Sequence, residues 1–128
     1  MTKEPIDAAG VPMSEWIADL PTTLNDIPVG MWVLVPNGRI GFGLEGPALV
    51  DFLRRCIHTL MDAGTKPVIK RGRPDTWELQ TKYGSNKHEV AEAVIQEWLR
   101  QGAPTPDPWD GVWFGLPWSY LPEGREVK

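Results

Sequence analysis

The stretch "GMWVLVPNGRIGFGL", residues 30–44, dominates the fold prediction for this chain. Met31–Val35 is a continuous apolar run of strand length and is rich in residues that favour strands. Asn37 and Gly38 are a strong hairpin-turn signal, because both residues tolerate a positive φ angle. Apolar side chains then alternate with glycines through Arg39–Leu44. The stretch therefore predicts an antiparallel hairpin.

A helix is expected directly after this hairpin, near residues 47–63. Apolar side chains recur there at helical spacing on one face. Pro47 suits the first position of a helix, and Gly64 is a natural residue to end it. Cys56 falls on the apolar face, so we expect a core side chain and not a reactive thiolate. Residues 30–64 are thus predicted to form a hairpin-helix (ββα) unit.

The same plan is expected in residues 66–102. "KPVIKRGRPDTWELQTKY" predicts strand, turn and strand, with Trp77 and Leu79 on one side. Asn86 and Glu89 have the spacing of a capping box, which predicts a second helix near residues 86–101. The two units have nearly equal length but little residue identity.

These units predict an α+β fold in a single domain spanning residues 1–128. The natural packing is a mainly antiparallel four-stranded sheet with both helices on one face. A short helix capped by Ser14 is expected ahead of Pro21. Residues 1–12 and 122–128 are expected to be loose tails.

Composition excludes some protein classes. The 128 residues include 13 Lys and Arg and 17 Asp and Glu, which gives a net charge of −4. No apolar run resembles a signal peptide or approaches the ~18 residues that a membrane span needs. The single cysteine excludes an internal disulfide, so the cytoplasm is the expected compartment. The charge is uneven, because residues 65–88 carry net +4 and residues 1–29 and 89–128 carry net −4 each.

The C-terminal segment 103–121 is rich in aromatic residues that glycine and proline keep out of a helix. Three of the seven tryptophans lie within "DPWDGVWFGLPWSY", residues 107–120. We expect this segment to be a structural clasp that packs on the domain, because burying aromatic surface contributes much stability. The alternative is a partner-binding or dimerisation surface, since Trp and Tyr dominate interface hot spots. Trp118 is the side chain expected to remain half exposed.

The stretch "GFGLEG", residues 41–46, matches the glycine spacing of a nucleotide-binding loop. Gly41, Gly43 and Gly46 would let a phosphate approach the start of a helix. A hairpin turn interrupts the strand that should precede such a loop, and the chain is short for a doubly wound domain. A nucleotide-binding or enzymatic domain therefore stays an alternative, and no cofactor is expected.

The sequence offers little for metal binding or nucleophilic catalysis. Cys56, His58 and His88 are the only soft ligands, and the first two are too close on a helix to point the same way. Ser85 lies near His88 but is better explained as a helix cap. No metal site and no catalytic residue are expected.

A basic turn in the second hairpin is a further candidate surface. Lys70, Arg71 and Arg73 crowd together there, near Trp77 and Tyr83. Nucleic-acid binding is a second alternative that the acidic sequence pI of about 5.1 disfavours. A docking site for an acidic protein, or a solvated turn, fits better.

The leading hypothesis is a small non-catalytic module that docks on another protein, as inhibitors, immunity proteins, phage-type regulators and adaptors do. Its partner is unidentified, and a homodimer through the C-terminal aromatic segment is possible. No membrane is expected as a partner. The expected partner-binding residues are Trp109, Trp113, Phe114, Trp118, Lys70, Arg71 and Arg73.

Overall fold

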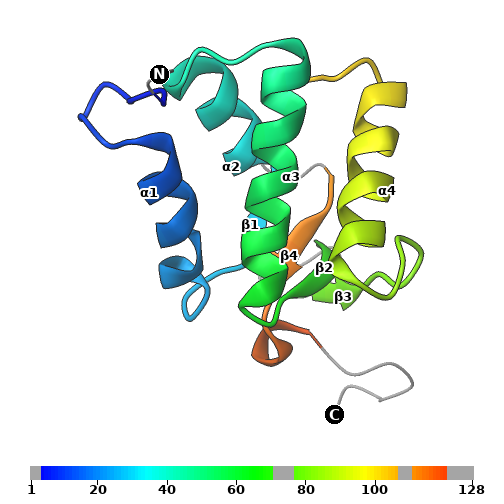
Figure 1. Ribbon diagram of the computed structural model, residues 1–128. Helices are drawn as coiled ribbons and strands as arrows, with labels where there is room; N and C mark the ends of the chain where they lie inside the picture. The colour runs from blue at the N-terminus through cyan, green and yellow to red at the C-terminus, as the bar shows by residue number, and fades with distance from the viewer. Residues whose placement is uncertain (1–3, 71–76, 107–110, 121–128) are drawn as a thin grey trace.

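The computed structural model describes residues 4–70, 77–106 and 111–120 and shows a mixed α+β fold (Figure 1). Within these residues, four strands form an antiparallel sheet in the order β1-β4-β2-β3. The elements are α1 (Met13–Asp19), the 3-10 turn η1 (Leu20–Thr23), β1 (Val29–Gly30), α2 (Met31–Pro36), the π-helical turn η2 (Asn37–Gly41), α3 (Gly46–Asp62), β2 (Lys66–Lys70), β3 (Trp77–Leu79), α4 (Lys87–Arg100), β4 (Trp113–Gly115) and the 3-10 turn η3 (Pro117–Ser119).

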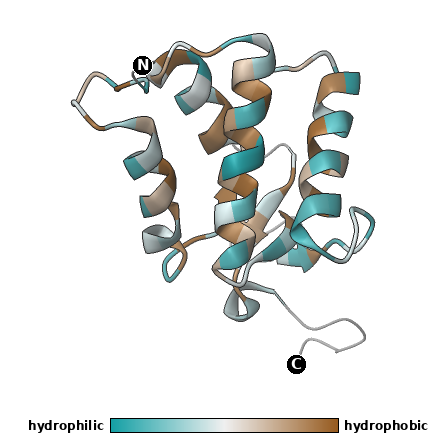
Figure 2. Cartoon of the chain, viewed as in Figure 1, coloured by the Kyte–Doolittle hydropathy of each residue, from teal (hydrophilic) through white to brown (hydrophobic). Residues whose placement is uncertain are grey.

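The two long helices α3 and α4 confirm the sequence prediction to within one residue at each end. Both are amphipathic, and the hydrophobic side of α3 lies toward the interior while hydrophilic residues lie outward (Figure 2). The Asn86 side chain accepts from the Glu89 N–H at 3.0 Å, and the Glu89 carboxylate accepts from the Ser85 N–H at 2.9 Å. Local signals therefore place these helices.

The second predicted hairpin is also confirmed. β2 and β3 pair antiparallel, with Val68 opposite Leu79 and Lys70 opposite Trp77. The turn between them, residues 71–76, lies outside the described residues.

The first predicted hairpin is wrong. Met31–Pro36 forms an α-helix, and Asn37–Gly41 continues it as a π-helical turn. Met31, Leu34 and Val35 are buried, and their spacing suits one face of a helix as well as a buried strand. Residues 30–64 are therefore not a ββα unit, and the chain does not contain two such units.

The residues that suggested a hairpin turn have other roles. The Asn37 side chain donates to the Val33 carbonyl at 2.7 Å. A Cβ on Gly38 would lie 2.6 Å from Cδ1 of Leu49 and 2.8 Å from Cδ2 of Phe52. Gly38 is therefore required because η2 packs closely on α3.

The remaining strands of the sheet come from outside the predicted hairpins. β4 pairs with β1 through Val29 and Phe114, and with β2 through Pro67 and Phe114. The aromatic C-terminal segment packs on the domain as expected, but it does so as an internal strand and not as a clasp laid across the sheet.

The two faces of the sheet have different coverings. Phe114 joins the main core on the face that the helices cover, and Trp113 joins a smaller aromatic cluster on the other face. The expectation of two helices on one face is thus incomplete, because α1 and α2 also contribute buried side chains to the main core.

The first described residues are held against α1. Ile6 bridges to Pro12, and the Met13 N–H donates to the Pro5 carbonyl at 2.9 Å. Ser14 is not the N-cap that the sequence suggested, because α1 begins at Met13. The Ser14 hydroxyl instead donates to the Glu4 carboxylate at 2.8 Å.

Candidate functional site

Three tryptophans form a row in the smaller aromatic cluster, on the sheet face away from the main core. The ring centroids of Trp32 and Trp113 lie 5.8 Å apart, and those of Trp113 and Trp77 lie 4.8 Å apart. A Cβ on Gly30 would lie only 2.7 Å from the Trp113 ring, so the bare glycine lets the indoles lie against the backbone. We call Trp32, Trp113 and Trp77 the tryptophan row.

An apolar groove runs between α1 with η1 and one end of this row. Its cavity volume is about 400 Å³, within the ~300–1,000 Å³ range typical of ligand pockets. Only Asp19 and Thr23 among its lining residues are polar. The apolar lining includes Trp16, Leu20, Ile27, Val29, Trp32 and Trp113.

The indole nitrogens of Trp32 and Trp113 are enclosed and lack an acceptor among the described residues. By contrast, the Trp98 indole N–H donates to the Pro104 carbonyl at 2.8 Å, and that of Trp118 donates to the Leu24 carbonyl at 3.0 Å. A buried donor without a partner costs about 1–3 kcal/mol. Two tryptophans that line the groove therefore have indole donors without an acceptor in the described residues.

Three exposed carboxylates lie in or next to the segments that line the groove, and we call them the acidic rim: Glu15, Asp19 and Asp26. Asp19 lines the groove, and Glu15 lies one helical turn away on the same side of α1. Asp26 directly precedes the groove residue Ile27. None of the three makes an ion pair within the described part of the chain.

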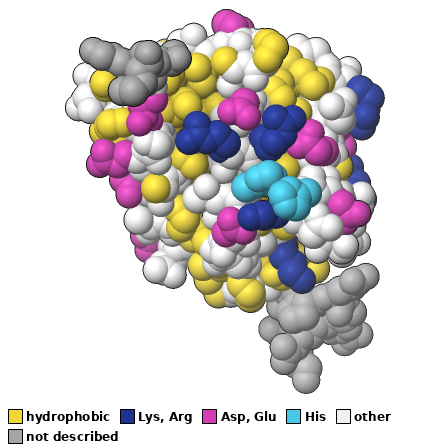
Figure 3. All heavy atoms as spheres, in the orientation of Figure 1, with side chains coloured by type: hydrophobic (Ala, Val, Ile, Leu, Met, Phe, Trp, Pro, Cys, Tyr) yellow, Lys and Arg dark blue, Asp and Glu magenta, His cyan; other side chains and the backbone are white. Residues whose placement is uncertain are grey.

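The outer face of α3 and α4 is different, because its charges pair with one another (Figure 3). Arg54 donates to both carboxylate oxygens of Glu92, at 2.6 and 2.9 Å. Lys87 contacts both carboxylate oxygens of Asp62, at 2.9 and 3.0 Å. The hydrogen bond from Arg54 lowers the pKa of Glu92 below its ordinary value. Four charged side chains of this face are therefore paired with one another.

The two histidines of the chain meet on that same face. The His58 and His88 rings stack edge to face with centroids 4.9 Å apart (Figure 3). Burial, followed by the charges of His88 and Lys87, lowers the pKa of His58, and the carboxylates of Asp62 and Glu92 oppose this shift. The lowered pKa favours the neutral form of His58.

The structure places the side chains that the sequence offered for metal binding and for thiol chemistry. In the described ranges, no group of three or more His, Cys, Asp or Glu side chains is placed to hold a metal ion. Cys56 is fully buried, and desolvation raises the pKa of its thiol far above the ordinary value. Cys56 therefore lies in the core, where the sequence placed it.

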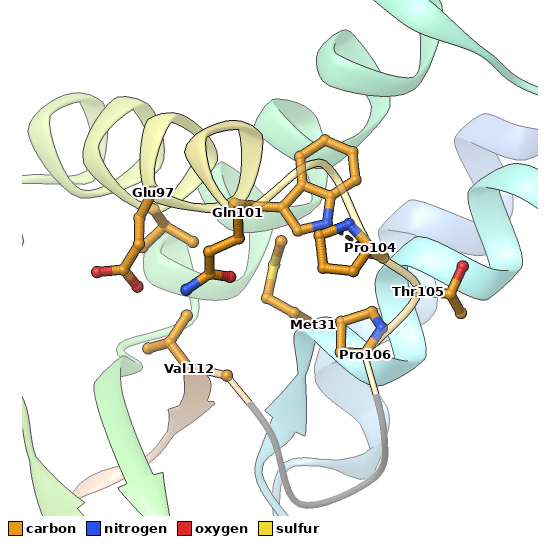
Figure 4. Close-up of a pocket in the computed structure, with 10 residues that line it drawn as sticks. Met31, Glu97, Gln101, Pro104, Thr105, Pro106 and Val112 are labelled. Atoms are coloured by element: carbon orange, nitrogen blue, oxygen red, sulfur yellow. Dashed lines mark hydrogen bonds between the residues drawn. The ribbon is translucent and has the colours of Figure 1, made fainter.

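A second pocket of about 490 Å³ lies between α4 and residues 104–106 (Figure 4). Glu97 and Gln101 face it from α4, and Met31 and Val112 form an apolar side. The Glu97 carboxylate already accepts from the Tyr83 hydroxyl at 2.7 Å and from Lys82 at 3.2 Å. This pocket therefore presents less unmet bonding capacity than the apolar groove.

The glycine-rich loop lacks the context that a nucleotide site needs. Gly41 is the last residue of the helical turn η2, and residues 42–46 follow it. The prediction that a strand precedes this loop is therefore wrong. Gly43 and Gly46 have φ angles of +67° and +55°, which favour glycine for backbone reasons alone. The loop is explained as the entry to α3.

The predicted partner-binding residues are scattered. Trp113 lies in the groove wall, and Phe114 is fully buried. Trp118 is 54% exposed, which agrees with the prediction that it remains half exposed. Lys70 is paired in β2 by its backbone. Trp109, Arg71 and Arg73 lie outside the described residues.

Sequence analysis missed most of the groove. Trp16, Ile27 and Trp32 line it, and none of them was singled out. A usable signal existed, because residues 4–38 contain five acidic residues and no Lys or Arg.

No protein-family model, no curated protein and no solved structure matches this chain. Among the described residues, none of the helices combines the length and the apolarity that crossing a bilayer requires.

Proposed function

We propose that this chain is a small non-catalytic protein-binding module, of the inhibitor, immunity, phage-type regulator or adaptor class, that acts in the cytoplasm by docking on another protein. The observation that supports the proposal is the apolar groove, which combines an almost wholly apolar lining with an acidic rim and with two indole donors that have no acceptor among the described residues.

Exposed side chains beside the groove fit this role. Ile27 is 47% exposed at the groove, and Trp118 is 54% exposed where its indole is tied to Leu24. Large apolar side chains at a concave surface are typical of protein interaction sites, and tryptophan is enriched among hot spots. Docking would remove this apolar area from water. The basic residues Lys70, Arg71 and Arg73 remain a second proposed docking element.

The test compares two exposed isoleucines. Ile27 lines the groove, whereas Ile40 is 83% exposed on η2 and is not among the groove residues. The candidate partners are proteins of the native cell that the wild-type chain and the Ile40→Asn variant both retain. The Ile27→Asn variant should not retain them. Each is then purified and its affinity measured. We expect Ile27→Asn to weaken binding by about tenfold or more. A partner that binds both variants equally contradicts docking at the groove.

Self-association is a separate form of the same proposal. Trp118 is the exposed aromatic through which a homodimer of the C-terminal segment would form. Sedimentation of the free protein, with Trp118→Ser as the variant, tests it. A wild-type dimer that the substitution dissociates supports self-association, and a monomer at all concentrations removes it.

A further inference from the structure

We infer that the apolar groove binds a peptide segment of a partner protein with an apolar centre and with Lys or Arg residues on its flanks. This inference rests on the proposed function and names the chemistry of the partner.

The apolar centre follows from the lining. The walls present aromatic and aliphatic side chains, among them Trp16, Leu20 and Val33, and Asp19 is the only ionisable residue. A charged or strongly polar group placed there would lose its hydration without gaining a partner. Only an apolar side chain enters this lining without that loss.

The basic flanks follow from the acidic rim. Glu15, Asp19 and Asp26 are exposed and unpaired within the described residues. Opposite charge at the edge of an interface speeds association and selects the partner, whereas like charge disfavours it. A segment with flanking Lys or Arg therefore matches the rim, and one with flanking Asp or Glu does not.

The same charges argue against other occupants. Anionic lipid surfaces and nucleic acids are repelled by an acidic rim. A symmetric contact between the grooves of two copies would bring two acidic rims together. Charge complementarity thus favours a different protein over a membrane, a nucleic acid or a second copy of this chain.

The indole donors give the segment a second contact. Trp32 and Trp113 have N–H groups without acceptors in the described residues, and peptide carbonyls are acceptors. Both nitrogens are enclosed, so a ring must turn slightly to reach a bound carbonyl. Binding is therefore expected to change these two indoles specifically.

The test uses peptide arrays with one set of six-residue apolar cores in three versions. The flanks are two lysines, two serines or two glutamates on each side. We expect the lysine version to bind the full chain about tenfold better than the serine version, with the glutamate version weakest. The preference should shrink as salt rises from about 0.1 to 1 M, because the Debye length falls from ~10 to ~3 Å.

Two sets of variants separate the parts of the inference. The triple variant Glu15→Gln, Asp19→Asn and Asp26→Asn should lose the flank preference and still bind the serine version. The triple variant Asp51→Asn, Asp62→Asn and Glu92→Gln makes the same charge change on the outer face of α3 and α4, away from the groove lining, and should keep the preference. Ile27→Asn should weaken all three versions, and Ile40→Asn should not.

Indole N–H resonances give an independent measurement with an internal control. On binding of a lysine-flanked peptide, we expect the signals of Trp32 and Trp113 to shift. The signal of Trp98 should stay in place, because its N–H already donates to the Pro104 carbonyl and its side chain does not line the groove.

The outcomes distinguish the two proposals. If glutamate-flanked cores bind as well as lysine-flanked ones through the groove, the basic partner is wrong and docking at the groove stands. If no core distinguishes the wild-type chain from Ile27→Asn, docking at the groove is wrong and this inference fails with it.

Discussion

The groove side of the molecule and the outer face of α3 and α4 both carry charged side chains, but these charges are arranged differently. On the α3–α4 face, Arg54 and Lys87 are each matched to a nearby carboxylate. At the groove, Glu15 and Asp19 lie beside an apolar hollow and have no ion-pair partner within the described residues.

This difference separates structural surface from candidate binding surface. Paired surface charges contribute little stability and leave little bonding capacity unmet. Within the part of the chain that the structure describes, the groove side combines unpaired acids with apolar walls and two indole donors that lack acceptors. We expect a partner at the groove mainly because of these acids and indole donors, and less because of the shape of the groove.

The largest loss of stability is expected on replacing Trp113, which lines the groove and lies in the sheet strand β4. Trp113→Ala should lower the free energy of unfolding by about 3–5 kcal/mol, because the indole is 1% exposed and packs on two other tryptophans. Trp118→Ala should cost only about 1 kcal/mol, since its ring is half exposed and loses one hydrogen bond. Denaturant unfolding measures both. Equal losses would contradict the separation of supporting and exposed tryptophans.

A smaller effect is expected from Gly30→Ala. The new methyl group would press on the Trp113 and Trp32 rings, which should cost about 1–3 kcal/mol. Gly41→Ala is the matched control, because its nearest atom is Oδ1 of Asn37 at 3.7 Å. Its effect should stay within about 0.5 kcal/mol. Thermal or denaturant unfolding compares the two variants. If Gly30→Ala leaves the free energy of unfolding unchanged, the tryptophan row can shift to accommodate the methyl group.

The charge comparison itself predicts a small difference in stability. Glu92→Gln breaks the pair with Arg54 and should cost at most about 1 kcal/mol. Glu15→Gln with Asp19→Asn should cost nothing or add about 0.2–0.5 kcal/mol, because like charges four residues apart repel. Urea unfolding at low salt shows whether each variant lowers or raises the free energy of unfolding. A clear loss at the groove would show that its acids are structural.

The smallest effect concerns pH. The pKa of His58 is lowered in the folded state, so the unfolded chain binds more protons near its ordinary value of about 6.5. The stability linked to neutral His58 is present above pH 6.5 and is lost as the pH falls through the lowered folded value. His58→Asn should reduce the loss of thermal stability that occurs as the pH falls below about 6.5. An unchanged slope would mean that other groups control it.

Local signals in the sequence were sufficient for part of the fold. α3 and α4 have long amphipathic stretches, and Asn86 with Glu89 begins α4 as predicted. The pairing of β2 with β3 joins residues that are close along the chain. Such elements depend little on distant residues, so their sequence patterns carry most of the information.

The candidate site was less accessible to sequence reasoning. Trp113 was singled out, but Trp32 and Ile27 were not, because nothing local shows that they meet it. The sequence did show that the first part of the chain is acidic, which is the charge now found at the groove rim.

The sequence by itself determined the α+β class, the two long helices, the second hairpin and the burial of Cys56. Only the tertiary structure decided the conformation of Met31–Gly41. An apolar run of five residues suits a helix face or a buried strand equally, so the residues that it packs against decide between helix and strand. Here β4 occupies the place beside β2, and Gly38 lets the helical turn pack on Leu49 and Phe52. Burial against a distant strand and helix therefore overrode a local hairpin signal.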